Sequence, residues 1–264
     1  MSGPPRSTLL GVLHLGALPG ARGHVSMADV VDRAVADAEA YAQADFDGLI
    51  VENFGDAPFR RGTADDPVTP DVVAGLAIVA DRAQRATGLP VGVNCLRNDG
   101  VAAFGVAAAV GAAWVRVNVL AGAYVTDQGV ISGEAARIAA YRRQVGSDAA
   151  LLADFMVKHA APLAPLDVAS GAKDLAERSG ADGLVLSGQR TGQPVDADLI
   201  DAVREAVGAF PIWIGSGLTA DNAASLWPRC QGAVVGTSCK AGGVASAPVD
   251  VERARRLRAA CDRR

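Results

Sequence analysis

Short apolar runs that close on polar residues recur along the whole chain, and this pattern constrains the fold more than any other feature. Two examples are Leu49-Ile-Val-Glu52-Asn53 and Leu151-Leu-Ala-Asp154-Phe-Met-Val-Lys158. Eight such runs alternate with amphipathic or apolar helical stretches, which is the order of elements in a (β/α)8 barrel. The sequence therefore predicts an α/β fold of the TIM-barrel type, whose chemistry collects where the strands end.

The eight predicted strands lie near residues 8–15, 47–54, 90–97, 112–119, 149–158, 182–189, 211–216 and 232–238. Helices are expected between them, for example over residues 27–44, where apolar residues recur at helical spacing. Thr69-Pro70 and Pro248 are helix-start signals. Because these signals alternate through all 264 residues without a linker, we predict one barrel domain over residues 1–264, with residues 1–7 as a flexible lead.

Similar glycine-containing turns lead into every second strand. Examples are Asp45-Phe-Asp-Gly48, Ser179-Gly-Ala-Asp-Gly183 and Gln231-Gly-Ala-Val234. A period of two strands fits a barrel whose inward side chains stack in layers contributed by alternate strands. The other explanation is that each glycine simply caps the preceding helix.

Composition excludes several kinds of partner. Half of the residues are apolar, and the formal net charge of −4 offers no broad basic surface for nucleic acid. The cysteines show no Cys-x-x-Cys spacing, the first residues lack the blocks of a signal peptide, and no apolar run reaches the about 20 residues of a membrane span. The chain is predicted to be cytoplasmic and reduced, without a transmembrane segment. A homo-oligomer is expected only by analogy with other barrels.

The longest connection, residues 55–69, follows the second strand and contains several charged residues and two prolines, with a third proline directly after it at Pro70. It is longer than most barrel loops, so it is either a lid over the strand ends or a solvated surface excursion.

Two turns of small residues end the last two strands and predict a phosphate site. The first turn is Ile212-Trp-Ile-Gly215-Ser-Gly217, which leads into an expected helix start at Thr219. The second is Val234-Val-Gly236-Thr-Ser238, a similar turn of small residues after the next strand. Small residues let backbone amides approach an anion, a helix start adds free amides, and barrel enzymes often bind phosphate on these two strands. The predicted phosphate-binding residues are Gly215, Ser216, Gly217, Gly236 and Thr237, with Lys240 as an added positive charge.

Ionisable residues gather at the other strand ends. Alternation places Arg116 and Asn118 on one face of the fourth strand, and Asp154, Met156 and Lys158 on one face of the fifth. Because an isolated buried charge is very costly, Arg116 and Asp154 either pair with each other or take part in the chemistry. The other candidates are His14, Glu52, Asn53, Asn94, Arg97, Ser187 and Gln189.

Four of these residues are the predicted catalytic groups. Glu52 and Asp154 are suited to acid/base work or to holding a divalent cation such as Mg²⁺. His14 is a third candidate, since imidazole titrates near neutrality. Lys158 either forms a Schiff base or binds a substrate oxygen as a cation from the loop. The predicted substrate-binding residues are Asn53, Asn94, Arg97, Arg116, Asn118 and Ser187.

Motifs at the same strand ends resemble the BtpA/SgcQ family. They are Gly11-Val-Leu-His-Leu-Gly-Ala-Leu-Pro-Gly20, Asp47-Gly-Leu-Ile-Val-Glu-Asn-Phe-Gly-Asp-Ala-Pro-Phe59, Gly92-Val-Asn-Cys-Leu-Arg-Asn-Asp99, Arg116-Val-Asn-Val-Leu-Ala-Gly-Ala-Tyr-Val-Thr-Asp-Gln-Gly129, Val157-Lys-His-Ala-Ala-Pro162 and Val235-Gly-Thr-Ser238. The resemblance covers nearly the whole chain and implies a barrel fold. Met156 departs from it, because a polar residue is common at that place in the family pattern.

The family's founding name comes from a factor needed for photosystem I biogenesis, and its SgcQ branch is linked by context to carbohydrate metabolism. Ile214-Gly-Ser-Gly-Leu-Thr-Ala-Asp-Asn222 also resembles the phosphate loop of phosphoribosyl-binding barrels, which implies a ribulose-phosphate-binding-like barrel.

Three functions follow from these observations. The first is an enzyme acting on a small phosphorylated sugar, phosphoribosyl or nucleoside-type compound, by isomerisation, lyase chemistry or cleavage of a glycosidic bond. The second is a non-catalytic assembly or stability factor that uses the barrel as a docking surface. The third is nucleotide or flavin binding, for which no fingerprint exists beyond the phosphate turns.

Overall fold

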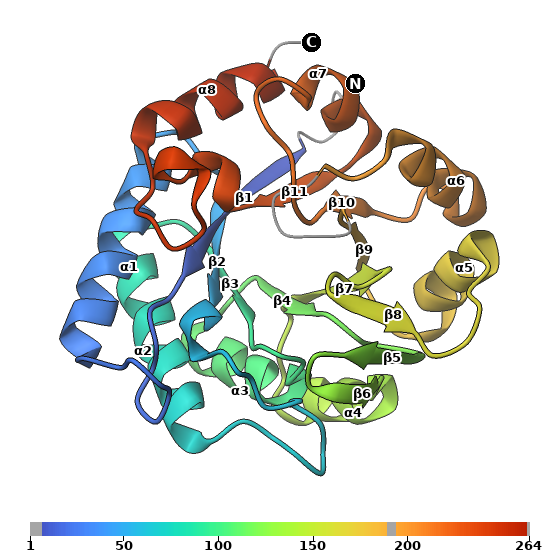
Figure 1. Ribbon diagram of the computed structural model, residues 1–264, viewed down its shortest axis with the longest axis horizontal. Coiled ribbons are helices and arrows are strands. Elements are labelled where there is room, and N and C mark those ends of the chain that lie inside the picture. Colours follow the sequence, from blue (N-terminus) through green and yellow to red (C-terminus); the bar gives the residue numbers. More distant parts are fainter. Residues whose placement is uncertain (1–6, 189–193, 263–264) are drawn as a thin grey trace.

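The computed structural model describes residues 7–188 and 194–262 and contains a closed barrel of eight parallel strands (Figure 1). The barrel strands are β1 (Thr8–His14), β2 (Gly48–Glu52), β3 (Val91–Asn94), β4 (Trp114–Val117), β7 (Ala150–Phe155), β9 (Gly183–Leu186), β10 (Ile212–Ile214) and β11 (Gly232–Val235). They follow one another around the barrel in chain order, and β1 closes it by pairing with both β2 and β11. All eight predicted strands are confirmed, with ends up to three residues shorter than expected.

Helices form an outer ring around these strands (Figure 1). They are α1 (Met27–Ala42), α2 (Pro70–Thr87), α3 (Gly100–Val110), α4 (Ala135–Gln144), α5 (Val168–Arg178), α6 (Ala197–Val207), α7 (Ala223–Leu226) and α8 (Val251–Asp262). Local capping residues explain where two of them begin. The Ser26 side chain accepts a hydrogen bond from the amide of Asp29 at the start of α1, and α2 begins at the predicted Pro70. None of the described helices is long and apolar enough to cross a membrane.

Alternation along the strands separates two apolar layers. The outward side chains pack beneath the helices in one large cluster. The inward ones fill the barrel itself, and they are Leu10, Val12, Ile50, Leu152, Val185, Trp213 and Val234, with Trp114 packed against them. Because the lower interior is filled, only the carboxyl ends of the strands remain for a site.

Two of the repeated glycines make room for tryptophans inside the barrel. A Cβ on Gly232 would lie 2.4 Å from Cζ3 of Trp213, and one on Gly48 would lie 2.8 Å from Cζ3 of Trp114. These positions support the explanation from stacked layers. Gly111 supports the other explanation, since it ends α3 in the left-handed conformation with φ of 69°.

A small antiparallel sheet that the sequence analysis did not predict lies beside β7 and α4 (Figure 1). It consists of β6 (Gly129–Ser132), β5 (Ala123–Thr126) and β8 (Ala160–Pro162), in that order. Tyr124 and Ile131 pack beneath it on Val119 and Val157. The alternation of Tyr124-Val-Thr126 followed by a polar turn is the local signal that indicates this hairpin.

The connection over residues 55–69 is tied to the rest of the barrel. Arg60 and Arg61 form ion pairs with Asp66, and the carbonyl of Arg60 accepts the amide of Arg97. The amide of Ala64 donates to the Glu134 side chain at 2.9 Å.

Candidate active site

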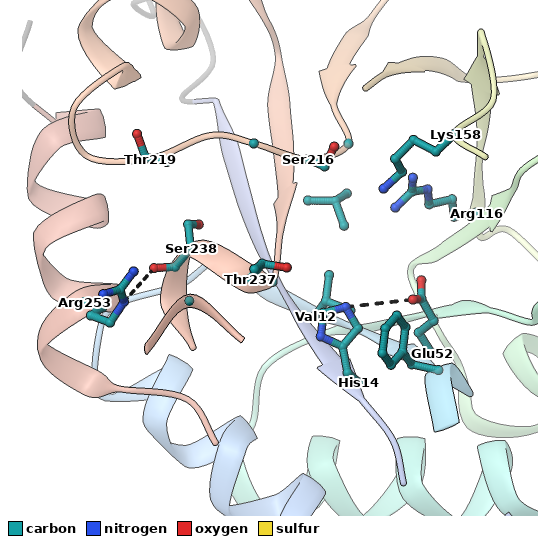
Figure 2. A pocket seen from close by; sticks show the side chains of 16 residues that line it. Val12, His14, Glu52, Arg116, Lys158, Ser216, Thr219, Thr237, Ser238 and Arg253 are labelled. Carbon is teal, nitrogen blue, oxygen red and sulfur yellow. Dashed lines mark hydrogen bonds and ion pairs between the residues drawn. The ribbon is translucent and has the colours of Figure 1, made fainter. Parts of the chain in front are cut away.

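A cavity of about 240 Å³ opens at the carboxyl ends of the strands and brings two groups of predicted residues together (Figure 2). Four of the predicted catalytic and substrate-binding residues line it, namely His14, Glu52, Arg116 and Lys158. All five predicted phosphate-binding residues line it as well, namely Gly215, Ser216, Gly217, Gly236 and Thr237. Residues from both ends of the chain thus meet in one space.

Free backbone amides line the side of the cavity that follows β10 and β11. They belong to Ser216, Gly217, Gly236, Thr237 and Ser238, and none of them donates to a backbone carbonyl within the described ranges. We call this set the amide cradle. The amide of Gly215, by contrast, donates to Leu186 at 2.7 Å and is not available. Five N–H groups without a backbone partner at one wall are donors that an anion could accept.

The turn after the cradle differs from the prediction. The expected helix start at Thr219 is instead a turn in which the Asn222 side chain accepts the Thr219 amide at 2.8 Å, and α7 that follows has only four residues. The free amides therefore come from the two loops rather than from a helix end. Lys240 also departs from its prediction: its ammonium is buried in an ion pair with Asp37 of α1 and does not line the cavity.

Sequence reasoning missed several residues that line the cavity. The additional lining residues are Val12, Phe54, Thr219, Ser238, Val234, Gly243 and Arg253. Arg253 matters most, because it brings a positive charge from α8, where its Nε donates to the carbonyl of Ser238 at 3.1 Å (Figure 2). No local signal in α8 distinguishes it from the neighbouring arginines, since only the packing of α8 directs it here.

His14 enters the cavity as a neutral base. Its Nδ1 donates to the carbonyl of Ala245 at 3.1 Å, so Nε2 is the free nitrogen, 3.9 Å from Oε1 of Glu52. Burial, followed by the positive charges of Lys240 and Lys158, lowers the pKa of His14 from 6.5 to about 3. The Phe54 ring packs 4.7 Å from the imidazole and holds it in place.

This lowered pKa predicts a specific dependence of stability on pH. Unfolded His14 takes up a proton near pH 6.5 and folded His14 only near pH 3, so the unfolded state binds more protons between these values. His14 should therefore cost the fold about 2 kcal/mol by about pH 5. Urea unfolding at pH 7 and pH 5 should show His14→Gln losing about that much less stability than the wild type. Equal losses in the two proteins would contradict the assignment.

Glu52 faces His14 from the end of β2. Burial raises the pKa of its carboxyl group, and the opposing charges of Arg116 and Lys158 do not cancel this shift. A carboxyl group whose pKa is moved toward neutrality exchanges protons readily under physiological conditions.

Arg116 and Asp154 satisfy each other, as one of the two predicted alternatives required. Arg116 Nε and Nη2 donate to the two carboxylate oxygens at 2.8 and 3.0 Å, and Asn118 Nδ2 adds a third bond at 2.7 Å. Asp154 itself does not line the cavity, whereas Arg116 does. Asp154 therefore fixes the guanidinium at the cavity wall.

Lys158 reaches the cavity from the loop after β7. The predicted alternation through Met156 is wrong, because the strand ends at Phe155 and Met156 turns outward with φ of 57° and 40% exposure. Nη2 of Arg97 donates a hydrogen bond to the carbonyl of Lys158 at 2.7 Å, which anchors this loop. Burial, then the charge of Arg116, lowers the pKa of the Lys158 ammonium from 10.5 to about 8.

The remaining predicted binding residues lie around the cavity and not in its wall. Asn53 stabilises the loop after β3, because its Oδ1 accepts a hydrogen bond from the amide of Leu96 at 2.7 Å. Asn94 donates to the carbonyl of Arg116 at 3.1 Å. Ser187 lies behind Gly215, and its buried hydroxyl has no partner among the described residues.

Three further predictions concern Gln189 and the N-terminal lead, the connection over residues 55–69, and a metal ion. Gln189 lies outside the described residues, as do residues 1–6 of the predicted lead. None of residues 55–69 lines the cavity. In the described ranges, no three His, Cys, Asp or Glu side chains form a group that could hold a metal ion. The divalent cation at Glu52 and Asp154 stays a prediction.

Comparisons with solved structures agree with the barrel geometry. N-(5'-phosphoribosyl)anthranilate isomerase from Pyrococcus furiosus matches with a TM-score of 0.58 and 12% identity, covering 97% of this chain and 98% of that one. Mycobacterium tuberculosis tryptophan synthase matches with a TM-score of 0.62 and 18% identity, covering 97% and 93%. At such low identities these likenesses show the fold alone.

Comparisons of sequence go further. An uncharacterized protein of Thermococcus kodakarensis is 42% identical over 253 residues, covering 96% of this chain and 94% of the relative. The photosystem I biogenesis protein BtpA of Synechocystis sp. is 41% identical over 243 residues, covering 92% and 83%. The BtpA family model matches residues 5–263. With a match over nearly its whole length and relatives at this identity, the chain belongs to the BtpA family.

Proposed function

We propose that this barrel is an enzyme that acts on a small phosphorylated sugar or phosphoribosyl-type compound. One observation carries the proposal: a single cavity has the amide cradle on one wall and Glu52, His14 and Lys158 on another. The first wall suits a phosphate group, and the second suits proton transfer to the rest of the same molecule.

The size and charge of the cavity support a small anionic substrate. Its volume of about 240 Å³ is below the roughly 300–1,000 Å³ of pockets for drug-sized ligands, which disfavours a dinucleotide or flavin. Arg116, Lys158 and Arg253 contribute positive charge to the wall. The Ser216 hydroxyl is buried beside the cradle without a partner among the described residues, so a bound phosphate oxygen would satisfy it.

The arrangement supports specific roles for the catalytic candidates. Glu52, with its raised pKa, would transfer protons, and neutral His14 would accept a proton at Nε2. Arg116 would orient the substrate, and Asp154 would act through Arg116 as a positioning residue. A divalent cation such as Mg²⁺ at Glu52 and Asp154 would compete with the three N–H groups that the Asp154 oxygens accept.

A thermal-shift screen tests the proposal. It compares inorganic phosphate, phosphorylated sugars and phosphoribosyl compounds with their unphosphorylated counterparts, with and without Mg²⁺. A phosphorylated ligand at about 100 times its dissociation constant should stabilise the fold by about 2.7 kcal/mol. Stabilisation by the phosphorylated compounds alone supports the proposal, and the absence of any shift contradicts it.

Arg253 provides a prediction with a matched control. Arg253→Gln should weaken binding of inorganic phosphate by at least about tenfold, because it removes a charge-assisted contact worth roughly 1.5–3 kcal/mol. Arg255 is an exposed arginine on the same helix, paired with Glu252. Arg255→Gln should leave the affinity unchanged. Equal effects of the two substitutions would show that only overall charge matters.

A second function, the assembly or stability factor, is favoured by a specific surface feature. Next to the small sheet, a groove of about 490 Å³ runs between Tyr124, Leu166 and Leu175. Several large apolar side chains on or near this sheet are exposed, namely Val125, Val130, Leu163 and Leu166. The named relative of Synechocystis is a biogenesis protein. Recovery of one stoichiometric partner that Leu163→Asp abolishes and Glu52→Gln does not would favour this function.

A further inference from the structure

Lysine is rare in this chain, and only one lysine lies in the cavity. The sequence holds three lysines among 25 basic residues. Lys173 is exposed on α5 beside Glu177, and Lys240 is buried in its ion pair with Asp37. Lys158 alone lines the cavity, and its ammonium has no hydrogen bond or ion pair to any residue that the structure describes. The three lysines therefore have three distinct environments.

The surroundings of Lys158 keep its amine without a carboxylate partner. Asp154 has both oxygens engaged by Arg116 and Asn118. Glu52 is buried, and burial raises the pKa of its carboxyl group. The Arg116 guanidinium lies near the amine on the same wall (Figure 2) and is the first charge that disfavours the ammonium form. A lysine beside another cation in a desolvated site is an activated nucleophile.

We propose that Nζ of Lys158 forms an imine with the carbonyl carbon of a small phosphorylated aldehyde or ketone, whose phosphate lies in the amide cradle. This inference rests on the proposed function and narrows its substrates to carbonyl compounds. It also narrows the reaction to isomerisation or carbon–carbon cleavage next to that carbonyl, since an imine withdraws electrons from the adjacent carbon.

The step balances with the groups in the cavity. Neutral Nζ adds to the carbonyl carbon and forms a C–N bond, while the carbonyl oxygen becomes a hydroxyl and nitrogen loses one proton. Glu52 then gives its proton to that hydroxyl, which leaves as water, and the C=N bond forms. The Glu52 carboxylate, or Nε2 of His14, next removes a proton from the adjacent carbon to give an enamine. No oxidant or reductant is consumed.

Reductive trapping tests the imine directly. The protein is incubated with dihydroxyacetone phosphate or ribulose 5-phosphate and sodium cyanoborohydride, and the product is analysed by intact mass and peptide mapping. We expect one adduct per chain, at Lys158, with at least about tenfold less at Lys173. The reason is that lowering the pKa of the Lys158 amine from 10.5 to about 8 raises its free-amine fraction at neutral pH roughly 300-fold. The trapping rate should rise with pH up to about pH 8 and then level off.

Two variants and a competitor sharpen the test. Lys158→Arg keeps the charge but cannot form an imine, so it should lose the adduct, whereas Lys173→Arg should keep it. Melting temperatures of both variants show whether they are folded. Glycerol 3-phosphate, which has the phosphate and lacks the carbonyl, should reduce trapping by competition. No adduct with either carbonyl compound, or equal labelling of Lys158 and Lys173, overturns the inference.

Failure of the imine and failure of phosphate binding are distinguishable. Stabilisation by glycerol 3-phosphate without any trapped adduct rejects the imine and leaves the phosphate site standing. Trapping of Lys158 by unphosphorylated dihydroxyacetone at the same yield, without stabilisation by glycerol 3-phosphate, supports the reactive amine and rejects the amide cradle as a phosphate site.

Discussion

Replacing Arg116 by methionine should lower the free energy of unfolding by about 3–5 kcal/mol. The substitution leaves Asp154, only 4% exposed, without the cation that bonds both of its oxygens. Breaking one side of a buried ion pair costs this much because the remaining charge stays desolvated. Urea denaturation of the wild type and the variant measures the difference.

The double variant Arg116→Met, Asp154→Leu is the control for this prediction. It removes both charges from the buried pair, so it should recover most of the stability that the single variant loses. A double variant that is no more stable than Arg116→Met would show that lost packing, and not the unpaired carboxylate, causes the destabilisation. Asn118 still offers its Nδ2 to position 154, and for that reason the recovery should be incomplete.

Replacing Gly236 by alanine should abolish the stabilisation by inorganic phosphate, an effect of about 2.7 kcal/mol at 100 times the dissociation constant. A Cβ at this position would lie 2.4 Å from Cε1 of His14, so the imidazole must shift from its place in the cavity wall. The same change disturbs one of the free amides of the cradle. Titration of the melting temperature with phosphate measures the loss.

Gly243→Ala is the matched control, because Gly243 also lines the cavity but its added Cβ would meet nothing closer than 3.8 Å. Gly243 has φ of 70°, so alanine there costs stability through backbone strain while leaving the cradle intact. Phosphate should still stabilise this variant by the same amount. Retained phosphate binding in Gly236→Ala would contradict the location of the anion site.

Much of the architecture was accessible from the sequence. Apolar runs closed by Glu52 or Asp154 predicted the strands correctly, with ends two or three residues too late, because side chains alternate between the interior and the helix layer of a closed barrel. The same periodicity explains why inward candidates on neighbouring strands converge. Register then places Glu52 beside Asn94 and Asn94 beside Arg116.

Other features depended on contacts between distant segments. Met156 has a positive φ and interrupts the alternation of the strand. The two-residue period of the sequence gave no sign of this turn. Lys240 was expected near the anion but is directed to Asp37, 203 positions away in the chain. The small sheet gains its third strand because β8, after the barrel strand β7, pairs with β5. Neither the turn at Met156, the partner of Lys240 nor the pairing of β8 has a signal within a few residues.

The sequence by itself therefore determined the barrel, the family resemblance and the end of the fold that holds the polar residues. Only the tertiary structure decided which of those residues satisfy one another and which face the cavity. Asp154 and Asn53 have their hydrogen bonds within the protein, whereas Ser216 and Lys158 keep groups directed to the site. The physical reason is that a buried polar group is stabilised by partners within about 3 Å. Strand register and loop paths, rather than spacing along the chain, determine those partners.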